Sequence, residues 1–162
     1  MKFSKSPEYR ELIDVIKKIK LKYKLSDADF FTDLQEEEVI PVSIFSKNLA
    51  PLETIVKYLK ENRNYTLSKI SRFLARSEKT IWQAYNSSLG KKKEAFTDFD
   101  FKYIVPLSAI SDRKYTVFEL LILYLVEQYH LKYSEVADLL KRDDRTVWVV
   151  YHRATKKRGD KK

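Results

Sequence analysis

Cysteine is absent from the 162 residues of the chain, which excludes disulfides, a thiolate nucleophile and cysteine-ligated metal sites. Glycine occurs only twice. Phosphate loops of the P-loop and dinucleotide-binding kinds need several glycines close to phosphate, so both are excluded. Two histidines, His130 and His152, are too few for a histidine-rich metal site. We therefore expect no metal, no cofactor and no catalytic group, and an enzyme is the least favoured class.

Long hydrophobic runs are also missing. The most apolar stretch, residues 117–126, contains Glu119 and is far shorter than the roughly 20 residues of a membrane-spanning helix. The N-terminal segment has no apolar run of the kind found in secretion signals. These absences predict a cytoplasmic protein with no membrane partner.

Basic residues are in excess. The chain has 32 Lys and Arg against 23 Asp and Glu, for a formal charge of +9, while 44% hydrophobic residues suffice for a core. Such a charge favours a polyanionic partner, namely DNA, RNA or an anionic membrane surface. A generally lysine-rich composition is the alternative explanation.

The chain contains an internal repeat. An offset of 66 places Leu52 on Phe118 and continues without a gap as far as Tyr85 on Tyr151. The identical pairs are Glu53/Glu119, Tyr58/Tyr124, Leu59/Leu125, Glu61/Glu127, Ser68/Ser134, Leu74/Leu140, Arg76/Arg142, Thr80/Thr146, Trp82/Trp148 and Tyr85/Tyr151. A repeat of this length indicates one supersecondary module used twice.

The segments before these repeats are also related. The sequence Phe-Thr-Asp at 31–33 returns at 96–98, and residues 40–43 resemble 105–108, here at an offset of 65. Because proline disfavours helix at the preceding residue, we expect extended structure over 39–45 and 103–110, as short strands or as arms packed on helices.

Apolar periodicity and end signals predict the helices. The expected ranges are 7–24, then 51–61, 67–74 and 78–88, and in the second repeat 117–129, 133–140 and 144–155. Thr116 with Glu119 forms a capping box, and Ser77 and Asp143 are favourable N-caps of the third helices. The predicted domains are an N-terminal amphipathic helix (1–30), repeat 1 with its connector (31–93), repeat 2 with its connector (94–157) and a basic tail (158–162).

In each repeat, only two residues, 75–76 or 141–142, separate the second helix from the N-cap of the third. Two short helices joined so tightly are typical of a helix-turn-helix. Small residues, Ser71 and Ala137, stand where the two helices would cross. The fold class is therefore mainly α: two tandem three-helix helix-turn-helix repeats with short extended connectors and an N-terminal helix.

Residues 66–85, Thr-Leu-Ser-Lys-Ile-Ser-Arg-Phe-Leu-Ala-Arg-Ser-Glu-Lys-Thr-Ile-Trp-Gln-Ala-Tyr, resemble the helix-turn-helix of region 4 of bacterial sigma factors. Residues 133–151 are similar, and the resemblance covers about 40 residues of each repeat. Ala75 and Lys141 occupy the turn position where the family often has glycine. The resemblance implies that the third helix reads the major groove of DNA.

The resemblance also implies contact residues. The base-reading candidates are Lys79, Thr80, Trp82, Gln83, Arg145 and Thr146, since Gln pairs with adenine and Lys reaches guanine or phosphate. The phosphate-binding candidates are Lys69, Arg72, Arg76, Lys91, Lys92, Lys93, Arg142, His152, Arg153, Lys156 and Lys157.

The second repeat is expected to be the poorer reader. Asp143 and Asp144 place negative charge where phosphate would approach, and Val149 replaces Gln83. The apolar run 148–151 predicts burial against another surface. The hypothesis is that repeat 1 reads the DNA sequence, while repeat 2 binds the DNA backbone or mediates contact between repeats or subunits.

The leading prediction is sequence-specific or architectural binding of double-stranded DNA, in transcription regulation or nucleoid association. An RNA- or ribosome-associated factor is the alternative, because Trp82 and Trp148 would stack on bases if they do not pack on the connectors. An adaptor that binds RNA polymerase is the third. An oligomer would form through the N-terminal helix or repeat 2.

Overall fold

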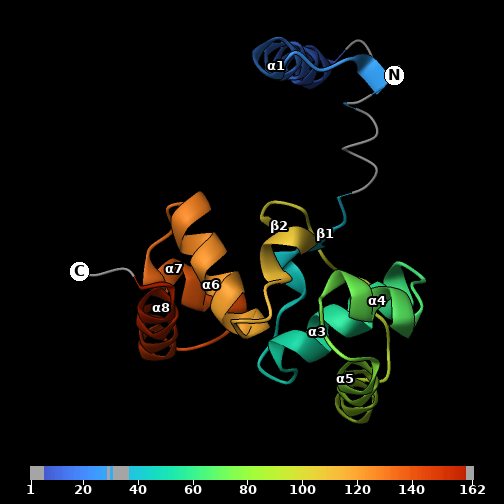
Figure 1. Cartoon of the computed structure of the whole chain (residues 1–162), viewed down its shortest axis with the longest axis vertical. Helices are drawn as coiled ribbons and strands as arrows, with labels where there is room; N and C mark the ends of the chain where they lie inside the picture. Colours follow the sequence, from blue (N-terminus) through green and yellow to red (C-terminus); the bar gives the residue numbers. More distant parts are fainter. Residues whose placement is uncertain (1–5, 29, 31–36, 160–162) are drawn as a thin grey trace. The chain divides into compact units, whose positions relative to one another are not determined.

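The computed structural model describes residues 6–28, 30 and 37–159 and is mainly helical, as predicted, with one small sheet (Figure 1). Contacts divide the chain into two units at Glu38 and Val39, and each unit is described by itself. None of the described helices is both long enough and apolar enough to cross a bilayer. The repeated motif at 31–33 lies outside the described residues.

The first unit contains α1 (Pro7–Tyr23), which ends one residue before the predicted end. The Ser6 hydroxyl caps α1 by accepting a hydrogen bond from the Tyr9 N–H at 3.1 Å. No side chain of α1 is buried, and apolar residues such as Leu12 and Val15 are exposed. The helix therefore presents its apolar residues unpacked.

The second unit contains two sets of three helices in the same order. The first set is α3 (Pro51–Lys57) with a π-helical turn (Tyr58–Asn62), α4 (Leu67–Phe73) and α5 (Glu78–Lys91). The second set is α6 (Val117–Gln128), α7 (Tyr133–Leu140) and α8 (Asp144–Arg158). All six helices lie where the sequence predicts them, although α5 and α8 each extend one turn further.

Corresponding turns have the same backbone conformation. Ala75 (φ 49°) and Lys141 (φ 55°), which join the second and third helices, are both left-handed. Asn64 (φ 56°) and His130 (φ 54°), which lie between the first and second helices, are left-handed as well. Alanine and lysine therefore adopt, at some energetic cost, the conformation for which glycine is favoured.

The two connectors pair with each other. Strands β1 (Val39–Pro41) and β2 (Ile104–Pro106) are antiparallel, with Ile40 opposite Val105. The extended structure predicted beyond the prolines is wrong, because the chain turns into short 3-10 helices there. The turns place apolar side chains of both connectors in the core, where burial stabilises them.

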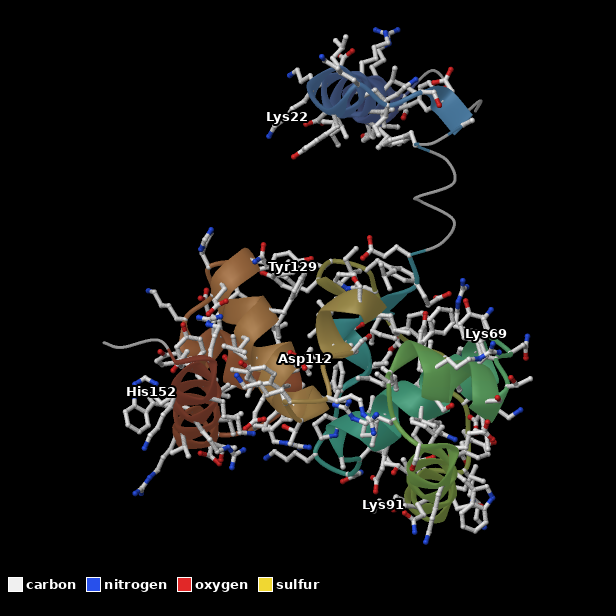
Figure 2. The ribbon with its side chains drawn as sticks, viewed as in Figure 1. Lys22, Lys69, Lys91, Asp112, Tyr129 and His152 are labelled. Carbon is white, nitrogen blue, oxygen red and sulfur yellow. The ribbon has the colours of Figure 1, made fainter. Side chains whose placement is uncertain are left out.

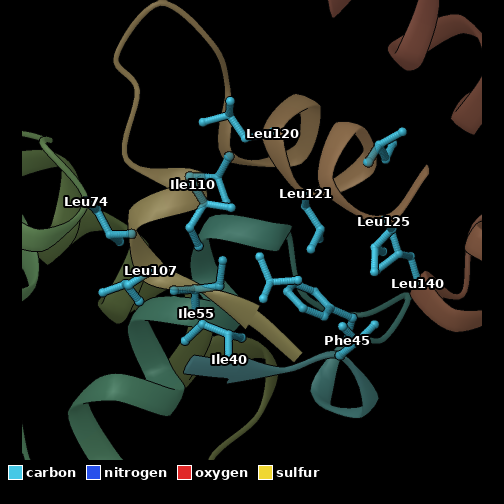
Figure 3. Packing of buried hydrophobic residues seen from close by; sticks show 14 of the residues in the cluster. Ile40, Phe45, Ile55, Leu74, Leu107, Ile110, Leu120, Leu121, Leu125 and Leu140 are labelled. Atoms are coloured by element: carbon cyan, nitrogen blue, oxygen red, sulfur yellow. The ribbon is translucent and has the colours of Figure 1, made fainter. Parts of the chain in front are cut away.

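A single hydrophobic core serves both sets of helices. Ile55 and Leu74 of the first set and Leu121 and Leu140 of the second belong to the same cluster of buried residues (Figure 3). The small residues predicted at the helix crossings, Ser71 and Ala137, are buried as well. Residues 39–159 therefore form one compact unit.

Two arginines connect the halves reciprocally. Arg76 donates to the carbonyls of Asp112 (3.3 Å) and Tyr115 (2.7 Å). Arg142 donates to the carbonyls of Ser46 and Leu49, each at 3.0 Å. In both cases the acceptors are the residue before the first helix's N-cap and the residue three earlier. Asp112 lies between the halves in Figure 2.

These contacts change the role expected of both arginines. The sequence predicted that Arg76 and Arg142 bind phosphate, whereas each guanidinium is engaged by carbonyls of the opposite half and is only partly exposed. Burial lowers the pKa of Arg76, and the neighbouring Arg113 lowers it further while Asp112 raises it. Both arginines therefore have a structural role, since each holds the opposite half of the protein.

We predict that Arg142→Ala lowers the free energy of unfolding by about 1–3 kcal/mol, because two partly buried carbonyls lose their donor. Arg76→Ala should have an effect of similar size for the same reason. Urea denaturation followed by circular dichroism measures both.

Arg113→Ala is the matched control, because Arg113 is exposed on the segment that Arg76 contacts. An equal shift of the urea midpoint in Arg113→Ala and Arg142→Ala would contradict the structural role.

Candidate nucleic-acid interface

The outer face of α5 is the first part of the candidate interface. The Ser77 hydroxyl caps the helix by accepting from the Thr80 N–H at 3.1 Å. Ile81, Ala84 and Ser88 turn into the core. The 3.6-residue period then leaves Lys79, Trp82, Gln83 and Asn86 exposed together.

Two of the polar base-reading residues predicted on α5 have unengaged side chains. The side chains of Lys79 and Gln83 are exposed, one turn apart, and make no hydrogen bond or ion pair with any residue that the structure describes. Thr80 differs, because its Oγ1 lies 2.8 Å from the Ser77 Oγ and it is half-buried. Lys79 and Gln83 are therefore two unengaged polar side chains that α5 can offer to a ligand.

α4 adds two basic residues next to α5. The Lys69 Nζ lies 3.8 Å from the centroid of the Tyr65 ring, a cation–π contact that holds the ammonium group in place. Arg72 is exposed, and with Lys69 and Phe73 it lines a shallow hollow. Lys69 is labelled beside α4 in Figure 2.

The outer face of α8 has a different chemistry. The Asp143 carboxylate caps the helix by accepting from the N–H and the hydroxyl of Thr146, both at 2.8 Å. The hydrogen bond from the Thr146 N–H lowers the pKa of Asp143, so the group stays charged. Arg145 is exposed, and Val149 stands exposed (45%) where α5 has a glutamine.

The burial predicted for the apolar run 148–151 holds only in part. Val150 is buried and Tyr151 is half-buried. Trp148 and Val149 have 47% and 45% of their surface exposed when the described residues are taken together. The reason is helical geometry, because only every third or fourth side chain of α8 faces the core. Trp82 is likewise 57% exposed.

Aromatic contacts hold His152, a predicted phosphate ligand. Its ring lies 4.1 Å from the Trp148 ring, centroid to centroid, and also contacts Tyr133 and Tyr151. Its Nδ1 is buried without a hydrogen-bond partner. His152 is thus half-buried in an aromatic cluster on α7 and α8, where Figure 2 labels it.

Three other predicted phosphate ligands hold carboxylates inside the protein. Lys91 pairs with Glu53 (2.9 Å), while Arg153 (2.8 Å) and Lys157 (2.7 Å) pair with Glu119. Each carboxylate also accepts from the backbone N–H of its helix's N-cap residue, Ala50 or Thr116. The third helix of each half is thereby fastened to the start of the first. Lys91 is labelled at α5 in Figure 2.

A second link joins the third helix to the first about two turns further along the first helix. The Tyr85 hydroxyl donates to Glu61 (3.2 Å), and the Tyr151 hydroxyl donates to Glu127 (3.4 Å). Burial raises the pKa of both tyrosines, and the adjacent carboxylates raise it further. Both hydroxyls therefore stay protonated at neutral pH and can donate.

Lys57, which the sequence did not single out as a functional or structural residue, has no exposed surface. Its ammonium group contacts both oxygens of Glu61 at 2.7 Å and the carbonyl of Lys93 at 3.5 Å. The i,i+4 spacing of Lys57 and Glu61 was the signal for the pair. The spacing by itself does not indicate burial, but the repeat does, because the equivalent residue of repeat 2 is the apolar Leu123, which is buried as well.

The remaining predicted phosphate ligands are Lys92, Lys93 and Lys156. Lys92 is half-buried, with its ammonium group 5.6 Å from the Phe96 ring centroid. Lys93 and Lys156 are exposed, and their ammonium groups have no hydrogen-bond or ion-pair partner among the described residues.

The chain matches no protein-family model, no curated protein and no solved structure.

We predict that Glu119→Gln lowers the unfolding free energy at neutral pH by about 1–3 kcal/mol, because Lys157 and Arg153 lose a charged acceptor. Burial raises the pKa of Glu119, but hydrogen bonds from Lys157, the Thr116 N–H and Arg153 bring it below the ordinary 4.5. The wild type therefore holds this stability above about pH 4.5 and loses it as pH falls through the lowered pKa.

Urea titrations at about pH 7 and about pH 3 would show the deficit of Glu119→Gln shrinking on acidification. Glu94→Gln, at an exposed position after α5, is the control and should leave stability unchanged at both pH values. A deficit in Glu119→Gln that does not depend on pH would contradict the ionic role.

Proposed function

We propose that residues 39–159 carry two helix-turn-helix modules and that the protein binds double-stranded DNA with α5 as the principal reading helix. A short helix, a left-handed turn residue and a longer third helix in each half support this reading. The observation that carries the proposal is the outer face of α5, where Lys79 and Gln83 are exposed and unengaged on a rigidly held helix.

In the proposed complex, α5 enters the major groove. Gln83 would pair with an adenine edge, and Lys79 would reach guanine or a phosphate. Arg72 and Lys69 on α4, together with Lys93 after α5, would contact the phosphate backbone and set the position of α5. Arg76 and Lys91 are omitted from this set because both hold other parts of the protein.

The proposed role of α8 is narrower. Arg145 and Lys156 are its unengaged basic residues, whereas Arg153 and Lys157 pair with Glu119. Asp143 and Asp144 would repel phosphate near the start of the helix. We therefore assign to repeat 2 a weaker hold on DNA, which suits a regulator of transcription or a nucleoid-associated protein that reads sequence mainly with repeat 1.

The exposed tryptophans favour RNA as the second candidate. Trp82 and Trp148 occupy corresponding positions and have 57% and 47% of their surface exposed. Aromatic rings so exposed can stack on unpaired bases. A protein partner such as RNA polymerase would use the same rings together with Val149. Duplex DNA is preferred because the polar pair on α5 suits base edges in a groove.

We predict that the full-length protein binds random duplex DNA with an affinity that falls steeply with salt. Lys79→Ala should weaken binding and reduce the slope of log affinity against log salt by about one unit if Lys79 contacts phosphate. Gln83→Ala should leave that slope unchanged and remove about 1–3 kcal/mol of discrimination at one base pair of a selected site. Fluorescence anisotropy measures these quantities.

Lys132→Ala is the control, because it removes one exposed positive charge from the loop that joins α6 to α7. If Lys132→Ala weakens binding as much as Lys79→Ala, net charge rather than α5 determines affinity. Tighter binding to structured RNA than to duplex DNA at the same salt concentration would reject the DNA proposal in favour of RNA.

A further inference from the structure

The contact between the two halves is reciprocal. Arg76 of the first half reaches the segment before α6, and Arg142 of the second half reaches the corresponding segment before α3. In a head-to-tail arrangement, the arginine of the first repeat would find its acceptors on the second repeat. The arginine of the second repeat would need acceptors on a third repeat, which is not part of this arrangement of two. Contacts in which each half offers the same group to the other are the mark of a twofold relation.

The sheet independently supports the same relation. Ile40 and Val105 are equivalent residues of the two connectors, and they stand directly opposite each other in the antiparallel pair of β1 and β2. A twofold axis through this pair exchanges the strands. The same operation exchanges Arg76 with Arg142 and α5 with α8.

The relation determines how the third helices are oriented. Figure 1 shows α5 and α8 nearly end-on, on either side of β1 and β2. Where a twofold axis is perpendicular to a surface, two helices that it relates and that lie along this surface run in opposite directions. Two tandem copies in the sequence are therefore inverted copies in space.

We propose that the DNA site of this protein consists of two half-sites in inverted orientation, one for α5 and one for α8; this inference rests on the function proposed above. DNA has local twofold axes of its own, so a protein with a twofold relation matches half-sites on opposite strands. The half-sites differ in sequence, because Lys79 and Gln83 of α5 correspond to Arg145 and Val149 of α8.

A swap within the chain tests the orientation. Arg145→Lys combined with Val149→Gln gives α8 the lysine and the glutamine that α5 has at the two equivalent positions, both of which are already exposed. This variant should select a site whose halves are inverted copies of each other. The reverse variant, Lys79→Arg with Gln83→Val, should select a different site with the same inverted symmetry.

The experiment is repeated selection from a random duplex library with the full-length wild type and both variants, followed by sequencing. Anisotropy titrations then compare each selected site with the same site in which one half is reversed. We expect reversal to weaken binding about tenfold or more, since a reversed half presents several mismatched base pairs.

The outcomes separate the two proposals. Selected sites in which the halves are direct repeats, or which bind equally well after reversal, would overturn the inverted orientation while leaving duplex binding intact. Failure of the wild type to bind or enrich any duplex would overturn the proposed function and this inference with it. Arg113→Ala, which removes an exposed charge outside the reading helices, should select the wild-type site.

Discussion

The buried carboxylates of Glu53 and Glu119 are the contacts on which the arrangement of each half depends. Each sits at the start of a first helix, accepts from the backbone there, and binds basic side chains of the third helix. A charged group without solvent is costly unless its lone pairs are satisfied, so the third helix is held where its cations can supply the donors. The outer faces of α5 and α8 follow from this placement, because the same helices cannot rotate without leaving a carboxylate unpaired.

The two halves are joined by contacts of another kind. Arg76 and Arg142 bind backbone carbonyls, whose positions depend on the fold of the segment rather than on its side chains. The paired strands and the common core also hold the halves together, since each half buries part of its apolar surface against the other. The two halves of residues 39–159 are thus held together by reciprocal hydrogen bonds, a shared sheet and a shared core.

Much of the fold could be predicted from the sequence because its signals are local. Cap residues such as Ser77 and Asp143 mark helix starts, and the 66-residue offset confirms each helix by its copy. The pairing of β1 with β2 could not be predicted, because antiparallel pairing of segments so far apart depends on tertiary packing. The 3-10 turns after the prolines were missed for the same reason.

The candidate site was harder to predict than the fold. Lys79 and Gln83 are exposed as expected, because helical periodicity decides which residues face outward. Lys91, Arg153 and Lys157 carry the same charge but are engaged by carboxylates, and charge alone does not reveal a partner. The repeat did contain that information: Lys91 and Lys157 stand 66 residues apart, as do Glu53 and Glu119. Two such coincident pairs indicate an internal contact.

Covalent connection also changes how the halves can vary. In a dimer of identical chains, every substitution appears twice, and association depends on protein concentration. Here Arg76 and Arg142 meet their acceptors within one chain, so the pairing is independent of concentration. A substitution in α8 leaves α5 unaltered. The acidic start and exposed apolar residues of α8 can therefore occur in the same protein as the polar outer face of α5.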